Sequence, residues 1–245
     1  MGNFIYTSMA SASEVMRGMA DVTHNLANAS TTGFRADLSM FKSLPIPGAV
    51  NGGSAPKFVR TGVDTSFGAL QNTGADLDVA VSGAGWIAVQ AEGGGEAYTR
   101  RGDLRLDAVG QLTNGAGQTI LGDGGPLAIP PHNKMEIAAD GTISIQPLGQ
   151  GPDTVAIVGR IKLVSLDEDA LFKDKSGLLR LKDGANAQED ASVSLVSGAL
   201  ESSNVNTVAT MVKMIELQRS YETQIKMMKT AADNDRSSAA LMKMN

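Results

Sequence analysis

Cysteine is absent from this sequence of 245 residues, and histidine occurs only twice. These absences exclude a disulfide scaffold, a thiol nucleophile and the usual ligand sets of zinc and iron–sulfur sites. Basic residues are also outnumbered, since 21 Lys and Arg face 26 Asp and Glu and give a formal net charge of -5. This balance argues against nucleic acid as a partner, because phosphate contacts require an excess of Lys and Arg. We expect no metal and no cofactor.

Long apolar runs are missing too. No segment approaches the roughly 18 apolar residues of a membrane-spanning helix, and the first basic residue is Arg17. That position is too late for the basic start of a cleavable signal peptide. We therefore expect no direct membrane insertion and no cleavable signal, whereas the 42% of hydrophobic residues is enough for a folded chain.

Glycine and proline divide the chain into two helical ends and a turn-rich middle. Residues 199–245 contain neither, and residues 1–32 contain only Gly2 and Gly18. Eleven of the twelve methionines lie within residues 1–40 or 211–244, and methionine adapts well to irregular packing surfaces. We predict an N-terminal helix with its turn over 1–35, an extended connector over 36–76, a β-rich domain over 77–200 and a C-terminal helix over 201–245.

The N-terminal segment is predicted to form an amphipathic helix, because apolar or small residues recur every three or four positions. They are Ile5, Met9, Ala12, Met16, Met19, Thr23 and Leu26, with Val15 and Val22 beside them. The helix should end near Asn25 and Asn28, where polar side chains compete for backbone hydrogen bonds, and Gly33 suits a positive φ. The plainer interpretation of this turn is an ordinary helix end followed by a loop.

The middle of the chain is predicted to be antiparallel β-structure in an irregular sandwich or barrel. Short β-rich runs occur over 77–81, 86–90, 97–100, 104–107, 134–137, 142–145, 155–158, 163–164 and 178–181. Asp140 and Gly141 predict a two-residue hairpin turn, and Gly83 to Gly85 predict another hairpin. The connector before these runs has room for one or two short strands. No amphipathic helix-length stretch separates the runs, so the expected class is α+β.

The C-terminal segment carries the strongest helix pattern. Val205, Val208, Val212 and Ile215 are spaced three and four apart, and the stripe then shifts in phase to Tyr221, Ile225, Met228 and Ala232. More than 40 helical residues would extend about 60 Å, which is longer than a compact domain needs. We therefore expect a helix that faces a partner or solvent.

Catalytic motifs are missing from the sequence. It has no phosphate-binding loop, no His-Glu-x-x-His pair and no Gly-x-Ser-x-Gly elbow. His24 and His132 lie beside turns and are interpreted as surface or capping residues. We expect no enzyme, although a glycan-active enzyme on the β domain stays a remote alternative, to be recognised by a pocket lined with carboxylates. An adhesin would need an exposed aromatic patch, and the whole chain has only ten aromatic residues.

Three parts of the chain resemble the bacterial flagellar rod and hook proteins. Residues 25–35 (NLANASTTGFR) resemble the N-terminal signature of that family, and residues 77–86, 97–104 and 106–112 resemble its shared β domain. Residues 201–206 and 211–219 resemble its C-terminal signature. The short connector after Phe34, the strand 86–90 and residues 226–231 are similar to the proximal-rod members, whereas His24 and Val109 stand where many relatives have Asn.

The resemblance implies a structural subunit of the flagellar basal-body rod that transmits torque. Its terminal helices would pair in an axial tube with the β domain outside, and a distal-rod or hook subunit is the alternative. The implied partners are other rod proteins above and below, copies of the same chain and the type III export apparatus, which would carry the unfolded chain from the cytoplasm to the periplasmic rod. The residues expected at the assembly interface are Ile5, Met9, Met16, Met19, Leu26, Asn25, Asn28, Gly33, Phe34, Val205, Val208, Val212, Ile215, Tyr221, Ile225 and Met228.

Overall fold

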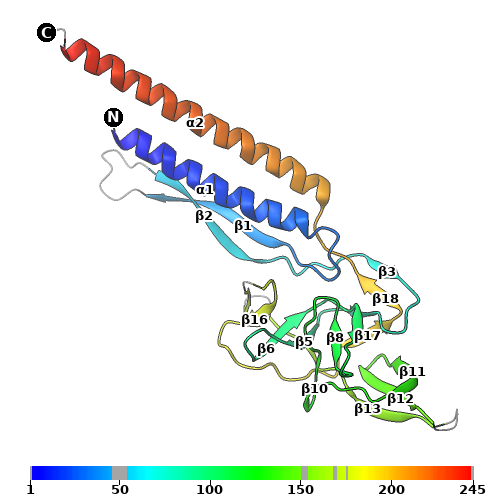
Figure 1. Cartoon of the computed structure of the whole chain (residues 1–245). Coiled ribbons are helices and arrows are strands. Elements are labelled where there is room, and N and C mark those ends of the chain that lie inside the picture. The colour runs from blue at the N-terminus through cyan, green and yellow to red at the C-terminus, as the bar shows by residue number, and fades with distance from the viewer. Residues whose placement is uncertain (1, 46–53, 150–153, 168–169, 175, 244–245) are drawn as a thin grey trace. The chain divides into compact units, whose positions relative to one another are not determined.

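The computed structural model describes residues 2–45, 54–149, 154–167, 170–174 and 176–243. Within these ranges an α-helix stands at each end, α1 (Gly2–Ala27) and α2 (Thr207–Lys243), and the strands β1 to β18 lie between them (Figure 1). The expected α+β class is confirmed. The chain divides into two compact units: unit 1 comprises Met1–Ala29, Asp37–Thr61 and Val205–Asn245, and unit 2 comprises Ser30–Ala36 and Gly62–Asn204.

Unit 1 combines the two helices with a two-stranded sheet. The sheet is formed by β1 (Asp37–Pro45) and β2 (Ser54–Val63), which lie in the segment where we expected a connector with one or two short strands. The helices pack along each other through a small cluster in which Val15, Val22 and Leu217 are buried. Met19, Met214 and Tyr221 are partly buried around these three side chains.

The sheet packs on a second face of α1, at Gly18. A Cβ atom at this position would lie 3.0 Å from the ring of Phe41 and 3.4 Å from that of Phe58, so only glycine leaves both rings undisturbed. The two rings meet edge to face with centroids 5.4 Å apart, a favoured aromatic geometry. One turn earlier, a Glu14 carboxylate oxygen accepts a hydrogen bond from the backbone N–H of Phe58.

An asparagine side chain caps the end of α1, and another caps the start of α2. The Asn28 amide donates to the carbonyl of His24 at 2.9 Å and so satisfies one of the carbonyls left open at the end of α1. Asn206 precedes α2, and its side-chain oxygen accepts the N–H of Ala209 at 3.0 Å, as expected of an N-cap residue. The C-terminal helix therefore begins six residues later than the segment 201–245 that we assigned to it.

Unit 2 consists of small sheets whose neighbouring strands run antiparallel. The largest has the strand order β14-β5-β6-β16-β15, and a second has the order β11-β12-β13. The other pairs in this unit are β10-β9, β17-β4, β18-β3 and β7-β8. The strand bounds are β3 (Leu70–Asn72), β4 (Val79–Ser82), β5 (Trp86–Gln90), β6 (Glu96–Thr99), β7 (Leu104–Leu106), β8 (Leu112–Asn114), β9 (Leu121–Gly122), β10 (Gly125–Pro126), β11 (His132–Ile137), β12 (Thr142–Pro147), β13 (Ala156–Arg160), β14 (Leu163–Val164), β15 (Leu171–Lys173), β16 (Leu179–Leu181), β17 (Ser194–Ser197) and β18 (Ala199–Glu201).

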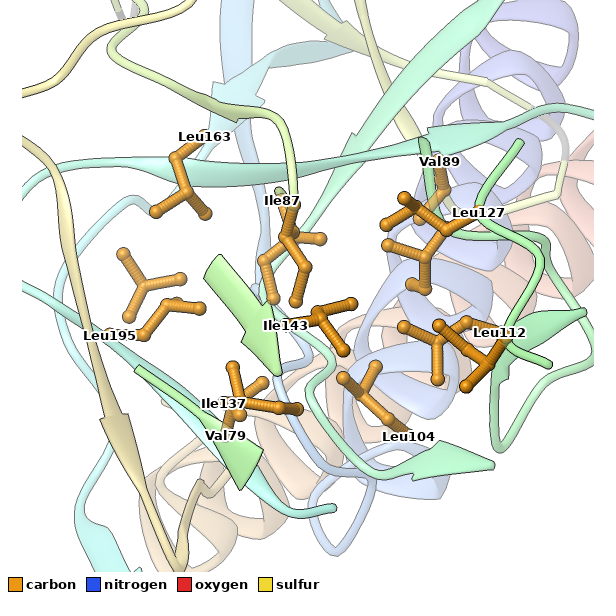
Figure 2. Close-up of a cluster of buried hydrophobic side chains, with 14 of the residues drawn as sticks. Val79, Ile87, Val89, Leu104, Leu112, Leu127, Ile137, Ile143, Leu163 and Leu195 are labelled. Carbon is orange, nitrogen blue, oxygen red and sulfur yellow. The ribbon is translucent and has the colours of Figure 1, made fainter. Parts of the chain in front are cut away.

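Strand β5 is buried on both faces. Ile87 and Val89 belong to the main core, whose side chains converge from many strands in Figure 2, whereas Trp86 and Ala88 belong to a second cluster with Tyr98. Successive side chains of a strand point to opposite faces, so a strand between two clusters must be apolar at every position. This placement explains the continuous apolar run that predicted β5.

The hairpin expected at Asp140 and Gly141 joins β11 to β12, with Ile137 opposite Ile143. Its loop has three residues rather than two, because the N–H of Ala138 bonds to the carbonyl of Thr142 and Gly141 has a φ of 86°. A turn followed by a left-handed glycine is a common three-residue hairpin. The hairpin predicted at Gly83–Gly85 is wrong, since β4 pairs with β17 and β5 with β6 and β14.

Candidate assembly interface

The contact between α1 and α2 uses every third or fourth residue of each helix. On α1 these include Val15, Met19 and Val22, and on α2 they are Met214, Leu217 and Tyr221. Such spacing is the pattern of two helices that pack side by side. Two residues of the expected interface, Met19 and Tyr221, therefore lie in this intramolecular contact.

A second apolar face of α2 is exposed. Val208 is 71% exposed, and Met211, Val212 and Ile215 are each 51% exposed. Ile225 is 40% exposed, but it lies four residues after Tyr221 and so on the other face. Over the described side chains of α2, only Leu217 among the apolar residues is fully buried, at 8%. The phase shift seen in the sequence thus separates two faces: residues 208, 212 and 215 lie on one, and 214, 217 and 221 lie on the other.

Helix α1 has a comparable division. Met9 and Met16 are 54% and 56% exposed, whereas Ala12, Val15 and Val22 are buried. Leu26 on α1, and Val205 and Met228 at the other end of the chain, are partly buried. Ile5 falls within α1, but its side chain lies outside the described residues.

The end of α1 is fastened to the start of β1 within unit 1. Asn25 makes two hydrogen bonds with the backbone of Asp37, accepting from its N–H at 2.8 Å and donating to its carbonyl at 3.0 Å. The carboxylate of Asp37, whose side chain is 3% exposed, lies 2.7 Å from Nδ1 of His24. His24, interpreted as a surface or capping residue, therefore bonds the first residue of β1.

Gly33 lies in a backbone conformation that other residues rarely adopt. Its φ is 66°, and a Cβ atom would overlap the peptide bond between Arg100 and Arg101. Its N–H donates to the carbonyl of Glu201 at 2.7 Å. The positive φ that we expected at this residue is confirmed. The close approach of the Arg100–Arg101 backbone is a second reason why only glycine fits at this position.

A buried carboxylate joins three distant segments of unit 2. Glu201 pairs with Nη2 of Arg35 at 2.5 Å and with Nη1 of Arg100 at 3.1 Å, and each of these side chains is 2% exposed. The N–H of Gly68 also donates to Glu201, at 2.8 Å. Burial lowers the pKa of Arg100 below its ordinary value, while the charge of Glu201 opposes that change.

Aromatic rings cover the two arginines. The guanidinium of Arg100 lies 5.1 Å from the Trp86 ring centroid and 5.0 Å from that of Phe67, and Arg35 lies 5.9 Å from Trp86. These cation–π contacts offset part of the cost of burying two cations beside one carboxylate. Lys173 extends the cluster, since its ammonium lies 3.9 Å from the Phe34 ring centroid and donates to the carbonyl of Arg35 at 2.8 Å.

Asn204 makes the remaining links within unit 2. Its side-chain oxygen accepts the N–H of Ala36 at 2.8 Å, and its amide donates to the carbonyl of Asp64 at 2.9 Å and to that of Ser66 at 3.1 Å. Residues 33–36, which follow α1 in sequence, are thus bonded to residues 201–204, which precede α2.

Sequence reasoning missed most of these polar residues. Arg35, Arg100, Glu201 and Asn204 all lie inside the segments that resemble the flagellar family, but their mutual contacts join positions more than 100 residues apart. The sequence did hold one indication, a charged residue among apolar or small neighbours in the chain, as at Glu201. That signal does not identify a partner.

Unit 2 also contains a polar cleft of about 500 Å³, which bears on the enzyme alternative. Three carboxylates line it, those of Glu96, Asp123 and Glu189. Glu96 pairs with Lys162 at 2.8 Å and Glu189 with Arg160 at 3.1 Å. Glycosidases act through two carboxylates that attack and protonate their substrate, and ion pairing occupies two of the three here. The cleft therefore does not support glycoside hydrolysis.

Among the described residues, no group of three or more His, Cys, Asp and Glu side chains could hold a metal ion. Neither helix has, over the part that the structure describes, an apolar stretch of the length that a membrane crossing requires.

Two segments of the chain match known protein families. Residues 80–145 match the family described as "Flagellar hook protein FlgE/F/G D1 domain", and residues 196–241 match "Flagellar basal body rod FlgEFG protein C-terminal". The chain belongs to the flagellar rod and hook proteins and is a structural subunit, not an enzyme.

Full-length relatives define the group within that family. The flagellar basal-body rod proteins FlgF of Salmonella typhimurium and Escherichia coli K12 are each 39% identical to this chain, over 252 and 258 residues that cover all of both proteins. The basal-body rod protein FlgG of Bacillus subtilis is 32% identical over 253 residues, covering 93% of this chain and 94% of the relative. The chain belongs to the FlgF family of flagellar basal-body rod proteins.

Proposed function

We propose that this chain is a subunit of the proximal rod that assembles through the exposed faces of its two terminal helices. The observation that carries the proposal is the apolar face of α2 formed by Val208, Met211, Val212 and Ile215, each at least 51% exposed. Apolar surface of this extent on one helix favours burial against another protein. The exposed Met9 and Met16 of α1 offer a second such surface.

The partners follow from the family. The relatives are named as basal-body rod proteins, which supports copies of this chain and other rod proteins as neighbours along the axis. A rod grows by heterologous contacts repeated along a helical axis, and such contacts differ at the two ends of a subunit. Terminal helices that pair in an axial tube would transmit torque from one subunit to the next.

The helices should gain stability from assembly. Because a helix with a thin apolar stripe gains little by burial in a monomer, its order depends on its neighbours and on subunit concentration. A chain with weakly held ends and no cysteine also suits passage, unfolded, through the type III export apparatus to the periplasmic rod. A distal-rod or hook position is the alternative, and the lower identity to FlgG makes it the weaker one.

Two substitutions on α2 test the proposed interface. The double variant Val212→Asp with Ile215→Asp places two charges on the exposed face, where the isolated chain has little packing to lose. We expect it to keep its circular dichroism spectrum and to be missing from purified basal bodies. Ile157→Asp is the matched control, because Ile157 is 73% exposed on β13 in unit 2. Normal incorporation of the double variant would contradict the proposal.

The position in the rod is a separate question. Labelling the chain in purified basal bodies and locating it relative to the ring embedded in the inner membrane distinguishes the proximal position from the distal one. We expect the label beside that ring. A label at the outer end of the rod, or in the hook, would support the alternative.

A further inference from the structure

The N-terminal turn of unit 2, residues 30–36, is held by residues that lie far along the chain. Gly33 donates to the backbone of Glu201, Arg35 pairs with its carboxylate, and the N–H of Ala36 bonds to the side chain of Asn204. The partners are separated by 166 residues for Arg35 and by 168 for Ala36. Closing so long a loop costs chain entropy that the local sequence of the turn does not recover.

The segment that supplies these bonds, residues 199–204, is itself anchored in unit 2. β18 pairs with β3 through Ala199, Leu200 and Glu201, and the N–H of Ser202 donates to the carbonyl of Ala69. We call residues 199–204 the C-terminal clasp. The bonds that hold the clasp on β3 do not involve the turn, whereas the three bonds of the turn given above all go to the clasp.

The charges make this dependence strict. With the clasp absent, Arg35 and Arg100 would be two buried cations without the carboxylate that pairs with both of them. Removal of one partner from a buried ion pair leaves an uncompensated charge, which is strongly unfavourable. The N-terminal turn would then open so that Arg35 could reach water.

We propose that Glu201 makes seating of the C-terminal clasp a condition for ordering the N-terminal turn. The turn that follows α1 thus becomes ordered only when about four fifths of the chain has entered the fold, and a chain that stops before residue 199 keeps it open. This coupling goes beyond the proposed assembly, since it acts within one isolated chain.

Amide hydrogen exchange of the full chain with Glu201→Gln tests the coupling. The substitution keeps the side-chain shape and removes the charge. We expect the amides of Gly33 and Ala36 to exchange at least tenfold faster, together with those of Gly68 and Ser202, while β11 and β12 stay as protected as in the unchanged chain. Unchanged protection at Gly33 and Ala36 would overturn the proposal.

The matched control is Glu96→Gln. Glu96 is nearly as buried as Glu201, with a side chain 6% exposed, and it also pairs with a cation, Lys162. The Lys162 that donates to Glu96 belongs neither to residues 30–36 nor to the clasp. We expect normal exchange at Gly33 and Ala36 in this variant. Faster exchange there would show that any lost ion pair loosens the turn, and the special role of Glu201 would fail.

Refolding of the unchanged chain gives a test that needs no variant. In pulse labelling after dilution from denaturant, protection at Gly33 and Ala36 should appear with or after protection at Ser202. Protection of the turn before the clasp would overturn the proposal. Because these measurements use the isolated chain, their outcome is independent of whether the chain enters a rod.

Discussion

The two units differ in what they bury. Unit 2 encloses many fully buried aliphatic side chains, such as Ile87, Ile143 and Leu163, in a core shared by several sheets. In unit 1 the described buried residues include Ser8, Ser11, Asp21 and Asp37, and its apolar interior is the short seam between α1 and α2. Unit 2 therefore has the larger apolar core, whereas the described part of unit 1 buries few apolar side chains.

This contrast separates two roles of apolar surface. In unit 2 hydrophobic burial stabilises the fold of the single chain. On α2 the same residue types remain in water, where they add nothing to the stability of the monomer and are available for association. The following predictions, ordered from the largest expected effect on rod function to the smallest, test that division.

The largest effect should come from Gly33→Val. A valine at a φ of 66° is strained by about 1–3 kcal/mol, and its Cβ would also overlap the Arg100–Arg101 peptide bond. We expect lost motility and rod assembly with the sheets of unit 2 intact by circular dichroism. Gly74→Val is the control, since Gly74 has a φ of 68° and no neighbour within 4 Å of an added Cβ. Normal motility of the Gly33 variant would show that the turn is dispensable.

A smaller effect should follow from shortening one buried side chain in each unit. Ile87→Ala in unit 2 removes a fully buried side chain and should cost about 2–5 kcal/mol. Leu217→Ala should weaken only the helix pair of unit 1. The single tryptophan, Trp86, lies in unit 2 and reports its unfolding separately from the helices.

Urea titrations read by fluorescence and by helical circular dichroism distinguish these two outcomes. We expect Ile87→Ala to lower the midpoint of the fluorescence transition and Leu217→Ala to leave it in place. A common shift of both signals by Leu217→Ala would mean that the two units unfold as one, and the contrast between them would fail.

The smallest effect concerns alkaline pH. Burial raises the pKa of Tyr98 from 10.0 to about 12, and the nearby charge of Glu96 adds to the shift. Because the folded state holds this proton more tightly, the stability of unit 2 is complete below pH 10.0 and falls by about 3 kcal/mol as the pH rises to about 12.

Tyr98→Phe should remove this alkaline loss, at the cost of the bond that the Tyr98 hydroxyl accepts from the N–H of Ala187. An absorbance titration of the folded chain should show one tyrosine that ionises late, and the variant should lack that step. Early ionisation of all three tyrosines would contradict the burial of Tyr98.

Local patterns predicted the elements that short-range chemistry determines. The end of α1 near Asn25 and Asn28, the apolar strand β5 and the hairpin at Gly141 all follow from side-chain and backbone preferences within a few residues. The hairpin loop came out one residue longer than predicted, because the left-handed glycine extends the turn rather than forming its centre.

Long-range partners could not be predicted in the same way. β17 and β18 are three or four residues long and pair with strands more than 100 residues earlier, so their short runs carried no clear strand signal. The sequence also shows two apolar faces on α2 without indicating which of them packs on α1. Residues 208, 212 and 215 have the more regular aliphatic pattern, yet Met214, Leu217 and Tyr221 make the contact. The expected assembly residues stay a prediction until variants are tested.

The bonds between residues 33–36 and 201–204 also have a mechanical consequence. A pulling force applied between the ends of the chain enters unit 2 at Ser30 and leaves it at Asn204, and Ala36, six residues after that entry, is bonded directly to Asn204. The load would cross from residues 33–36 to residues 201–204 through the Ala36–Asn204 hydrogen bond and the Arg35–Glu201 ion pair. This path is only a few residues long. The sheets of unit 2 lie in the loop between these points and would carry tension only after that short path had broken.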